Sequence, residues 1–200
     1  MKKTLTKEYE SKKAEIQNKL KEFKHLQEEA HFSEMLFCLL TPQSNAKRCW
    51  EAVIELRKKN TQKEEKIRKI LKTKTRFHNN KSRYIVKAFK QWKTIVLQLD
   101  NPKRIELRNW LADNVSGFGL KEASHFLRNI GKSENQIAIL DRHILRNLKE
   151  LKIIKDEKIK NKKHYLDIEE KFLAFSSKMQ IPIDELDLLF WGRENGEIFK

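Results

Sequence analysis

The stretch NVSGFGLKEASHFLRNIG, residues 114–131, holds three of the five glycines in a chain of 200 residues. Gly117 and Gly119 bracket a phenylalanine and are followed closely by Lys121. Glycine adopts positive φ at little steric cost, so this pair lets the backbone turn tightly and expose consecutive N–H groups. Apolar residues on both sides follow helical spacing. The stretch therefore predicts two helices joined by a tight turn that can bind a phosphate at a helix N-terminus.

Helical spacing of apolar residues continues through most of the chain, and strand-like alternation is nowhere sustained. We expect an amphipathic helix over 6–30, a short buried helix that starts at Ser33, and another that starts at Thr41 with Pro42 in its first turn. Three further helices are expected over 63–73, 104–113 and 121–130. Another helix is expected after a polar turn at 78–81, and one more is expected to begin at Asp141. The sequence predicts an all-α fold.

The chain is strongly basic along its whole length. It carries 44 Lys and Arg against 28 Asp and Glu, a formal net charge of +16. Such a balance favours a polyanionic partner, with nucleic acid first and an anionic membrane surface second. A lysine-rich surface that reflects heat adaptation is the alternative reading. The sequence holds no apolar run typical of a signal peptide or membrane span, so we expect a soluble, intracellular protein without membrane contact.

Cys38 and Cys49 are the only cysteines, and both fall in helical apolar patterns. They are expected to be buried thiols in a reducing cytosol. Two cysteines exclude a four-cysteine metal site or iron–sulfur cluster, and His125 and His143 are too isolated to predict a zinc site. We expect no cofactor and no iron–sulfur cluster.

The hairpin and three other segments together resemble the helix–hairpin–helix DNA glycosylase superfamily. LADNVSGFGLK has the superfamily's G-x-G-x-K pattern, and LDRHI places Asp141 twenty residues after Lys121. LLTPQSNAKR and NKSRYI precede them in the superfamily's order, so the resemblance covers about residues 36–146. The chain is most similar to the archaeal-type 8-oxoguanine DNA glycosylase/AP lyase branch. Ser116 is a departure, because the superfamily commonly has proline there, and we expect it to alter only the stiffness of the turn.

The resemblance implies a two-subdomain helix–hairpin–helix glycosylase fold with the active cleft between subdomains. One subdomain would be a central bundle over about 33–143 that contains the hairpin 114–121. The other would combine about 1–32 with 144–200. The implied partner is double-stranded DNA containing 8-oxoguanine, bound by a monomer in the cytoplasm of a prokaryote, in association with the nucleoid.

Lys121 and Asp141 are the expected catalytic residues. A neutral lysine amine can displace the base at C1′, form a Schiff base with the opened sugar, and lead to strand cleavage by β-elimination. Asp141 is a favoured helix N-cap, and a carboxylate held there can also stabilise oxocarbenium-like charge and manage the protons of the lysine.

Further site residues follow from the resemblance and from the need to flip the damaged base out of the duplex. Gln43 is expected to insert toward the orphaned base, Trp191 to stack on the flipped purine, and Lys200 to contact the oxidised guanine. The residues expected at the DNA backbone or the opposite strand are Ser116, Gly117, Gly119, Lys81 and Arg83. Such hairpins can also hold a monovalent cation through backbone carbonyls, which here would be those of Asp113, Val115 and Phe118.

Two alternatives stay open from the sequence. A glycosylase for another lesion, such as thymine glycol or a mismatched base, would share Lys121 and Asp141 and differ in its base pocket. A non-catalytic helix–hairpin–helix DNA-binding module would be equally basic and would keep the glycines. Simple binding does not require Lys121 followed by Asp141, so the enzyme is the favoured interpretation.

Overall fold

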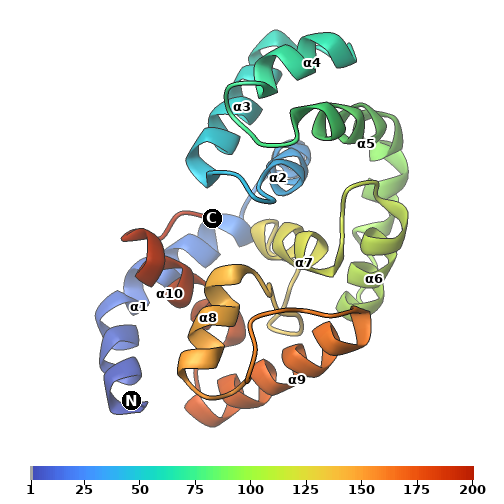
Figure 1. Cartoon of the computed structure of the whole chain (residues 1–200). Helices are drawn as coiled ribbons and strands as arrows, with labels where there is room; N and C mark the ends of the chain where they lie inside the picture. The colour runs from blue at the N-terminus through green and yellow to red at the C-terminus, as the bar shows by residue number, and fades with distance from the viewer. Residues whose placement is uncertain (1) are drawn as a thin grey trace. The chain divides into compact units, whose positions relative to one another are not determined.

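The computed structural model describes residues 2–200, except for the side chains of residues 2, 3 and 195. Ten α-helices and no β-strand make up this described part (Figure 1), which confirms the expected all-α class. No helix within it is long and apolar enough to cross a membrane. Contacts between residues divide the chain into two compact units, one of residues 27–126 and one that combines 2–26 with 127–200.

The unit of residues 27–126 is built around α2 (Glu28–Leu40), whose sequence is apolar on nearly every side. Helix α2 packs against α3 (Ala46–Lys59) and α5 (His78–Gln98), while α4 (Glu64–Leu71) packs against both α3 and α5. Each large apolar side chain buried in this way contributes about 1.5–3 kcal/mol to folding. Helix α6 (Arg104–Asn114) and the start of α7 (Leu120–Asn129) complete the unit and carry the hairpin.

Several helix ends differ from the sequence expectation. Helix α2 begins at Glu28, so Ser33 lies inside it, and α3 begins at Ala46 instead of near Thr41 and Pro42. The N-cap of α3 is Asn45, whose side chain accepts the Arg48 N–H at 3.1 Å. This capping bond favours a helix start after Asn45 over the expected start at Thr41. Residues 41–45 are therefore a turn. The expected polar turn at 78–81 is instead the first turn of α5.

The second unit is built around α10 (Ile183–Asn195), which packs against α1 (Lys2–Lys24), α8 (Arg142–Glu150) and α9 (Lys162–Met179). The expected helix over 6–30 ends at Lys24, because Gln27 takes an extended conformation as the N-cap of the next helix. The last residues of α7 also belong to this unit. Helix α7 ends at Asn129 and is followed by Gly131, where φ is +68° and an added Cβ would lie 2.5 Å from the Lys24 Cα. Only glycine fits this approach.

Candidate active site

The hairpin between α6 and α7 turns tightly at Gly117. Its φ is +93°, and an added Cβ would lie 2.5 Å from the Cδ2 of Tyr84 on α5. The Phe118 N–H donates to the Val115 carbonyl at 3.0 Å, which closes the turn. Gly117 thus confirms the expectation of positive φ. Gly119 does not, because its φ lies outside the positive region and its N–H donates to the Glu122 carboxylate at 3.1 Å.

Lys121 lies in the first turn of α7, directly after the hairpin, with 21% of its side chain exposed. Its Nζ lies 3.6 Å from Oε1 of Glu122, whose Oε2 accepts the Gly119 N–H. Glu122 therefore connects the lysine to the turn, a role that our sequence interpretation missed. The available signal was a glutamate at the third position of a helix, where it reaches back to the N-cap N–H. The arrangement presents an amine at a helix N-terminus beside a glycine turn.

Lys81 has a different environment from the one expected at the DNA surface. Only 3% of the residue is exposed, and its ammonium donates to Leu40 O at 2.7 Å, Pro42 O at 2.8 Å and Ser44 Oγ at 2.9 Å. An ammonium has three protons, so none is left for a phosphate oxygen. This position does not support the predicted DNA-backbone or opposite-strand contact of Lys81, because tertiary packing turns the side chain inward.

The charges around Lys81 include that of Lys121. Burial lowers the pKa of Lys81 to about 8, and the cationic Lys121 and Arg76 act in the same direction. Burial also raises the pKa of the Cys49 thiol to about 11, which keeps this buried group neutral near pH 7. The amine of Lys121 therefore shares its surroundings with a second, buried amine and a neutral thiol.

Gln43 and Arg83 are both exposed in the unit of residues 27–126. Gln43 lies in the turn between α2 and α3 with a φ of 53°. Arg83 donates to the backbone oxygen of Asn79 at 3.3 Å and to the side-chain oxygen of Asn80 at 3.1 Å, which fixes its guanidinium on the first turn of α5. Both side chains lie on the surface, where a DNA strand can reach them.

Phe77 is a surface residue that our sequence interpretation missed. It precedes α5, has a φ of 56° and is 51% exposed. The neighbouring Arg76 N–H donates to Ser44 Oγ at 2.9 Å, so Phe77 follows a residue that is bonded to the turn carrying Gln43. A large exposed aromatic residue in the left-handed region is unusual. No sequence signal beyond an aromatic residue before a polar helix start could have found it.

In the other unit, Asp141 caps the N-terminus of α8, as the sequence predicts. Its Oδ1 accepts both the His143 N–H at 2.8 Å and the Ile144 N–H at 2.9 Å. Both capping bonds therefore use one carboxylate oxygen, and Oδ2 takes neither of them. The preceding segment, residues 137–140, is buried and non-helical.

Side chains of α9 hold the segment that leads to Asp141. The Tyr165 hydroxyl donates to Ala138 O at 2.7 Å, and the Ala138 N–H donates to Glu169 Oε1 at 2.7 Å. Backbone groups buried outside regular structure need such partners. Tyr165 and Glu169 therefore fix the approach to the capping carboxylate, a role that local sequence patterns did not indicate.

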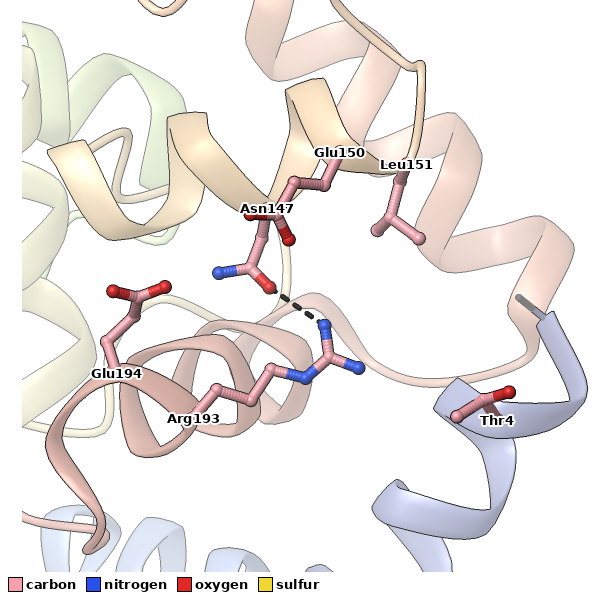
Figure 2. A pocket seen from close by; sticks show the side chains of 6 residues that line it. All are labelled: Thr4, Asn147, Glu150, Leu151, Arg193 and Glu194. Atoms are coloured by element: carbon pink, nitrogen blue, oxygen red, sulfur yellow. Dashed lines mark hydrogen bonds between the residues drawn. The ribbon is translucent and has the colours of Figure 1, made fainter.

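Arg193 of α10 is hydrogen-bonded to helix α8 and to helix α1. It donates to the Asn147 side-chain oxygen at 2.8 Å and, through two nitrogens, to the Glu8 carboxylate on α1. Arg193 and Asn147 border a pocket of about 420 Å³ (Figure 2), lined by Thr4, Asn147, Glu150, Leu151, Arg193 and Glu194. A bidentate guanidinium–carboxylate pair is geometrically specific. We assign Arg193 a structural role, since it joins α10 to α8 and to α1.

The segment after α10 folds back on that helix. Gly196 has a φ of +78°, and a Cβ at Gly192 would lie 2.6 Å from Ile198 Cδ1, so both glycines permit the reversal. It places the Phe199 ring 6.4 Å from the Trp191 ring, centroid to centroid. The Lys200 ammonium lies 5.9 Å from the centroid of the Phe23 ring.

The predicted site residues are thus distributed over both units. Asp141, Trp191 and Lys200 belong to the unit that contains α8 and α10. The residues in the unit of residues 27–126 are Gln43, Lys81, Arg83, Ser116, Gly117, Gly119 and Lys121. Ser116 is half-buried and its Oγ accepts a hydrogen bond from Lys87 at 3.4 Å. The roles expected of these residues stay predictions.

The backbone carbonyls of the hairpin are the expected ligands of a monovalent cation. Val115 O already accepts the Phe118 N–H and keeps one further lone pair for a cation. Across the described residues, no group of three or more His, Cys, Asp or Glu side chains is placed to hold a metal ion. The cation at Asp113, Val115 and Phe118 stays a prediction.

Comparison with known proteins gives the family. A family model described as 8-oxoguanine DNA glycosylase matches residues 16–181. The chain belongs to this family. An 8-oxoguanine DNA glycosylase/AP lyase of Fusobacterium nucleatum is 43% identical over 96% of this chain and 94% of its own length. Another, of Methanocaldococcus jannaschii, is 36% identical over 90% of this chain and 87% of its own length.

Solved structures of 8-oxoguanine DNA glycosylases have the same fold. The crystal structure of the Thermotoga maritima glycosylase matches with a TM-score of 0.90 at 30% identity, over 100% of this chain and 98% of that one. The Methanocaldococcus jannaschii glycosylase/lyase in complex with a 15mer DNA containing 8-oxoguanine matches with a TM-score of 0.85 at 34% identity, over 98% and 100%. These matches confirm the predicted fold family.

Proposed function

We propose that this protein removes 8-oxoguanine from duplex DNA and cleaves the strand at the resulting abasic site. The observation that carries the proposal is the near full-length similarity to relatives named 8-oxoguanine DNA glycosylase/AP lyase, at 43% and 36% identity. The lysine that follows the glycine hairpin supplies the amine that such a two-step reaction needs. The net charge of +16 suits a DNA substrate and predicts salt-sensitive binding.

Lys121 is the proposed nucleophile. Its neutral Nζ attacks C1′ of the damaged nucleotide, the bond from C1′ to the base breaks, and the base leaves with the bonding pair and takes up a proton. The sugar ring then opens to a Schiff base on Nζ, and loss of a C2′ proton expels the 3′ phosphate by β-elimination. The half-buried position of Lys121 beside the hairpin supports this role.

Asp141 is proposed to stabilise positive charge on the sugar and to exchange protons with Lys121. The capping bonds use only Oδ1, so Oδ2 is suited to stabilise positive charge on the sugar as the base departs. The same carboxylate can receive a proton from the lysine amine and return it later. The capping bonds also hold the carboxylate in one orientation, which lowers the cost of reorganisation.

DNA contacts are proposed for the hairpin and for the exposed residues of α2–α5. The backbone of Ser116 and Gly117 would hold a phosphate, and the Gly119 N–H would join by exchanging its bond to Glu122. Gln43 would fill the space left by the flipped nucleotide, and the exposed Phe77 would wedge between neighbouring bases. Arg83 is proposed to contact the opposite strand.

Trp191 and Lys200 are proposed as base-pocket residues. The indole offers an apolar face for the flipped purine, and the lysine offers donors for its oxidised edge. We propose that the protein works as a monomer without a cofactor, in the cytoplasm with the nucleoid, where genomic DNA of a prokaryote lies.

Borohydride trapping tests the proposal directly. Wild-type protein is mixed with duplexes that carry one 8-oxoguanine, one thymine glycol or no lesion, and the reductant converts a Schiff base into a stable adduct. We expect an adduct only with 8-oxoguanine, none with Lys121→Gln, and an unchanged adduct with Lys90→Gln, a substitution of an exposed lysine on α5. Trapping on thymine glycol alone would contradict the substrate. Tight binding without any adduct would contradict the amine mechanism.

A further inference from the structure

The turn between α2 and α3 holds Gln43 in an unfavourable backbone conformation. Its φ of 53° lies in the left-handed region, which is sterically costly for a residue with a Cβ. Residues of this kind persist only where the surrounding structure holds them. Gln43 itself is exposed, so its own side chain is not buried against the protein. The constraint must come from its neighbours in the turn.

The buried Lys81 ammonium supplies this constraint through its hydrogen bonds to the turn. It donates to Leu40 O, at the C-terminus of α2, and to Pro42 O and Ser44 Oγ, which lie on either side of Gln43. All three distances are 2.9 Å or less, so these are strong, charge-assisted hydrogen bonds. Ser44 Oγ also accepts the Arg76 N–H at 2.9 Å. One buried charge therefore fixes the turn at three points.

Burial of a lysine side chain is unfavourable for the stability of the fold. Taking an ammonium out of water opposes folding, and an apolar side chain of similar volume at such a site often gives equal or greater stability. Burial accordingly lowers the pKa of Lys81 to about 8. Stability alone therefore does not account for a lysine at this position, whereas control of one specific turn conformation does.

We propose that Lys81 is a positioning residue for base flipping: its buried ammonium fixes the 41–45 turn so that Gln43 is presented to the duplex in a preformed conformation. The proposal rests on the role given to Gln43 in the proposed function. Lys81 touches neither DNA nor the reacting atoms, and it acts only through the turn. Without the tether, the turn relaxes to lower-cost conformations, and the ordering must then be completed during each encounter with DNA.

A double-mutant cycle separates this role from simple stabilisation. We would compare wild type, Gln43→Ala, Lys81→Met and the double variant in single-turnover excision of 8-oxoguanine from a duplex. From the cost of the left-handed conformation, Lys81→Met should slow excision roughly 5–30-fold in the wild-type background. In the Gln43→Ala background it should change the rate by less than about twofold, since both substitutions remove the same contribution. Rate losses that multiply in the double variant would overturn the proposal.

Opening of the base pair can be measured separately, without excision of the base. A 2-aminopurine placed beside the lesion becomes fluorescent when it unstacks, so the same four proteins can be compared by the fluorescence change on binding. If wild type excises no 8-oxoguanine, the substrate assignment fails, but this cycle still decides the tether. Equal fluorescence changes in wild type and Lys81→Met would overturn the positioning role.

Two controls guard the interpretation. Lys90→Met removes an exposed lysine from the same helix, and it should leave both measurements within about twofold of wild type because it does not reach the turn. If Lys81→Met does not fold, as judged by circular dichroism, Ser44→Ala takes its place. That variant removes one acceptor while the ammonium remains, and it should show the same lack of additivity with Gln43→Ala.

A pH series adds a signature that a purely structural role would not give. The charged and titratable groups that act on Lys81 are Cys49 of α3, Lys121 of α7 and Arg76 before α5. As pH rises through about 8, Lys81 loses a proton and its neutral amine keeps only two donors for three acceptors. The ratio of wild-type to Gln43→Ala excision rates should therefore fall between pH 7 and pH 9.

Both proteins in this ratio contain the same catalytic residues, so any other pH dependence of the excision step is common to the two rates and cancels in their ratio. In the Lys81→Met background, the corresponding ratio should be small and constant across the series. A wild-type ratio that stays constant from pH 7 to pH 9 would overturn the tether.

Discussion

Substitution of Gly117 by alanine should damage the hairpin through two separable effects. The φ of +93° is strained for any residue with a Cβ, which costs about 1–2 kcal/mol. The new Cβ would also lie 2.5 Å from Cδ2 of Tyr84, an atom of a rigid ring, and relief of such overpacking costs about 1–3 kcal/mol. The free energy of unfolding should therefore fall by about 2–5 kcal/mol in total.

Other glycines of the chain provide matched controls for the two effects. Gly196 has a φ of +78° with no atom within 4 Å of an added Cβ, so Gly196→Ala should show only the backbone cost of about 1–2 kcal/mol. Gly119 has no positive φ, and its added Cβ would meet only the flexible end of Glu122 at 3.3 Å. Gly119→Ala should therefore lower stability by less than about 1 kcal/mol.

Urea denaturation of the three variants measures these differences, and binding to a duplex that contains an abasic-site analogue measures the functional effect. Displacement of the turn also moves Lys121, so Gly117→Ala should lose excision activity at temperatures where it remains folded. If Gly117→Ala proves no less stable than Gly196→Ala, then the ring of Tyr84 does not constrain the turn. A steric conflict between a Cβ at position 117 and Tyr84 would then be refuted.

Three further predictions concern other parts of the molecule. Asp141→Asn keeps a capping oxygen and should retain stability but lose most excision activity, whereas Asp141→Ala should also lower the free energy of unfolding by about 0.5–2 kcal/mol in urea denaturation. Gly131→Ala places a Cβ 2.5 Å from backbone Cα of Lys24, so its melting temperature should fall more than that of Gly196→Ala, a ranking that calorimetry can check. Burial lowers the pKa of Lys81 from 10.5 to about 8, so the unfolded chain binds the proton more tightly than the folded one between these values. As pH rises from 8 to 10.5, the free energy of unfolding of wild type should therefore increase by up to about 3 kcal/mol relative to that of Lys81→Met. Equal pH dependence of the two proteins in urea titrations would contradict the lowered pKa.

Local chemistry was sufficient to predict the parts of the site that lie within one short segment. The G-x-G-x-K spacing located the hairpin, and the helical spacing around it located α6 and α7 within a residue or two. Asp141 was recognisable as an N-cap because aspartate before a periodic apolar run has that preference by itself. These features depend on interactions between residues a few positions apart, which the order of residues specifies directly.

The features that the sequence did not reveal depend on contacts between distant positions. Lys81 looked like any other lysine of a basic chain, and only the packing of α5 against α2 turns its ammonium onto Leu40, 41 residues away. Gly119 was expected to share the backbone role of Gly117, but its φ is not positive, and its N–H donates to the Glu122 carboxylate at the start of α7. A helical pattern states which residues are apolar, not which neighbour each will meet.

The sequence by itself determined the fold class, the hairpin and the two chemically distinctive groups, Lys121 and Asp141. Tertiary structure alone decided that the Lys81 ammonium is buried against the 41–45 turn, and that Phe77 is exposed. The physical reason is the distance along the sequence over which each interaction acts. Helix periodicity, capping and glycine conformations act over a few residues, whereas burial and its effect on charge are set by segments that meet only after the chain has folded.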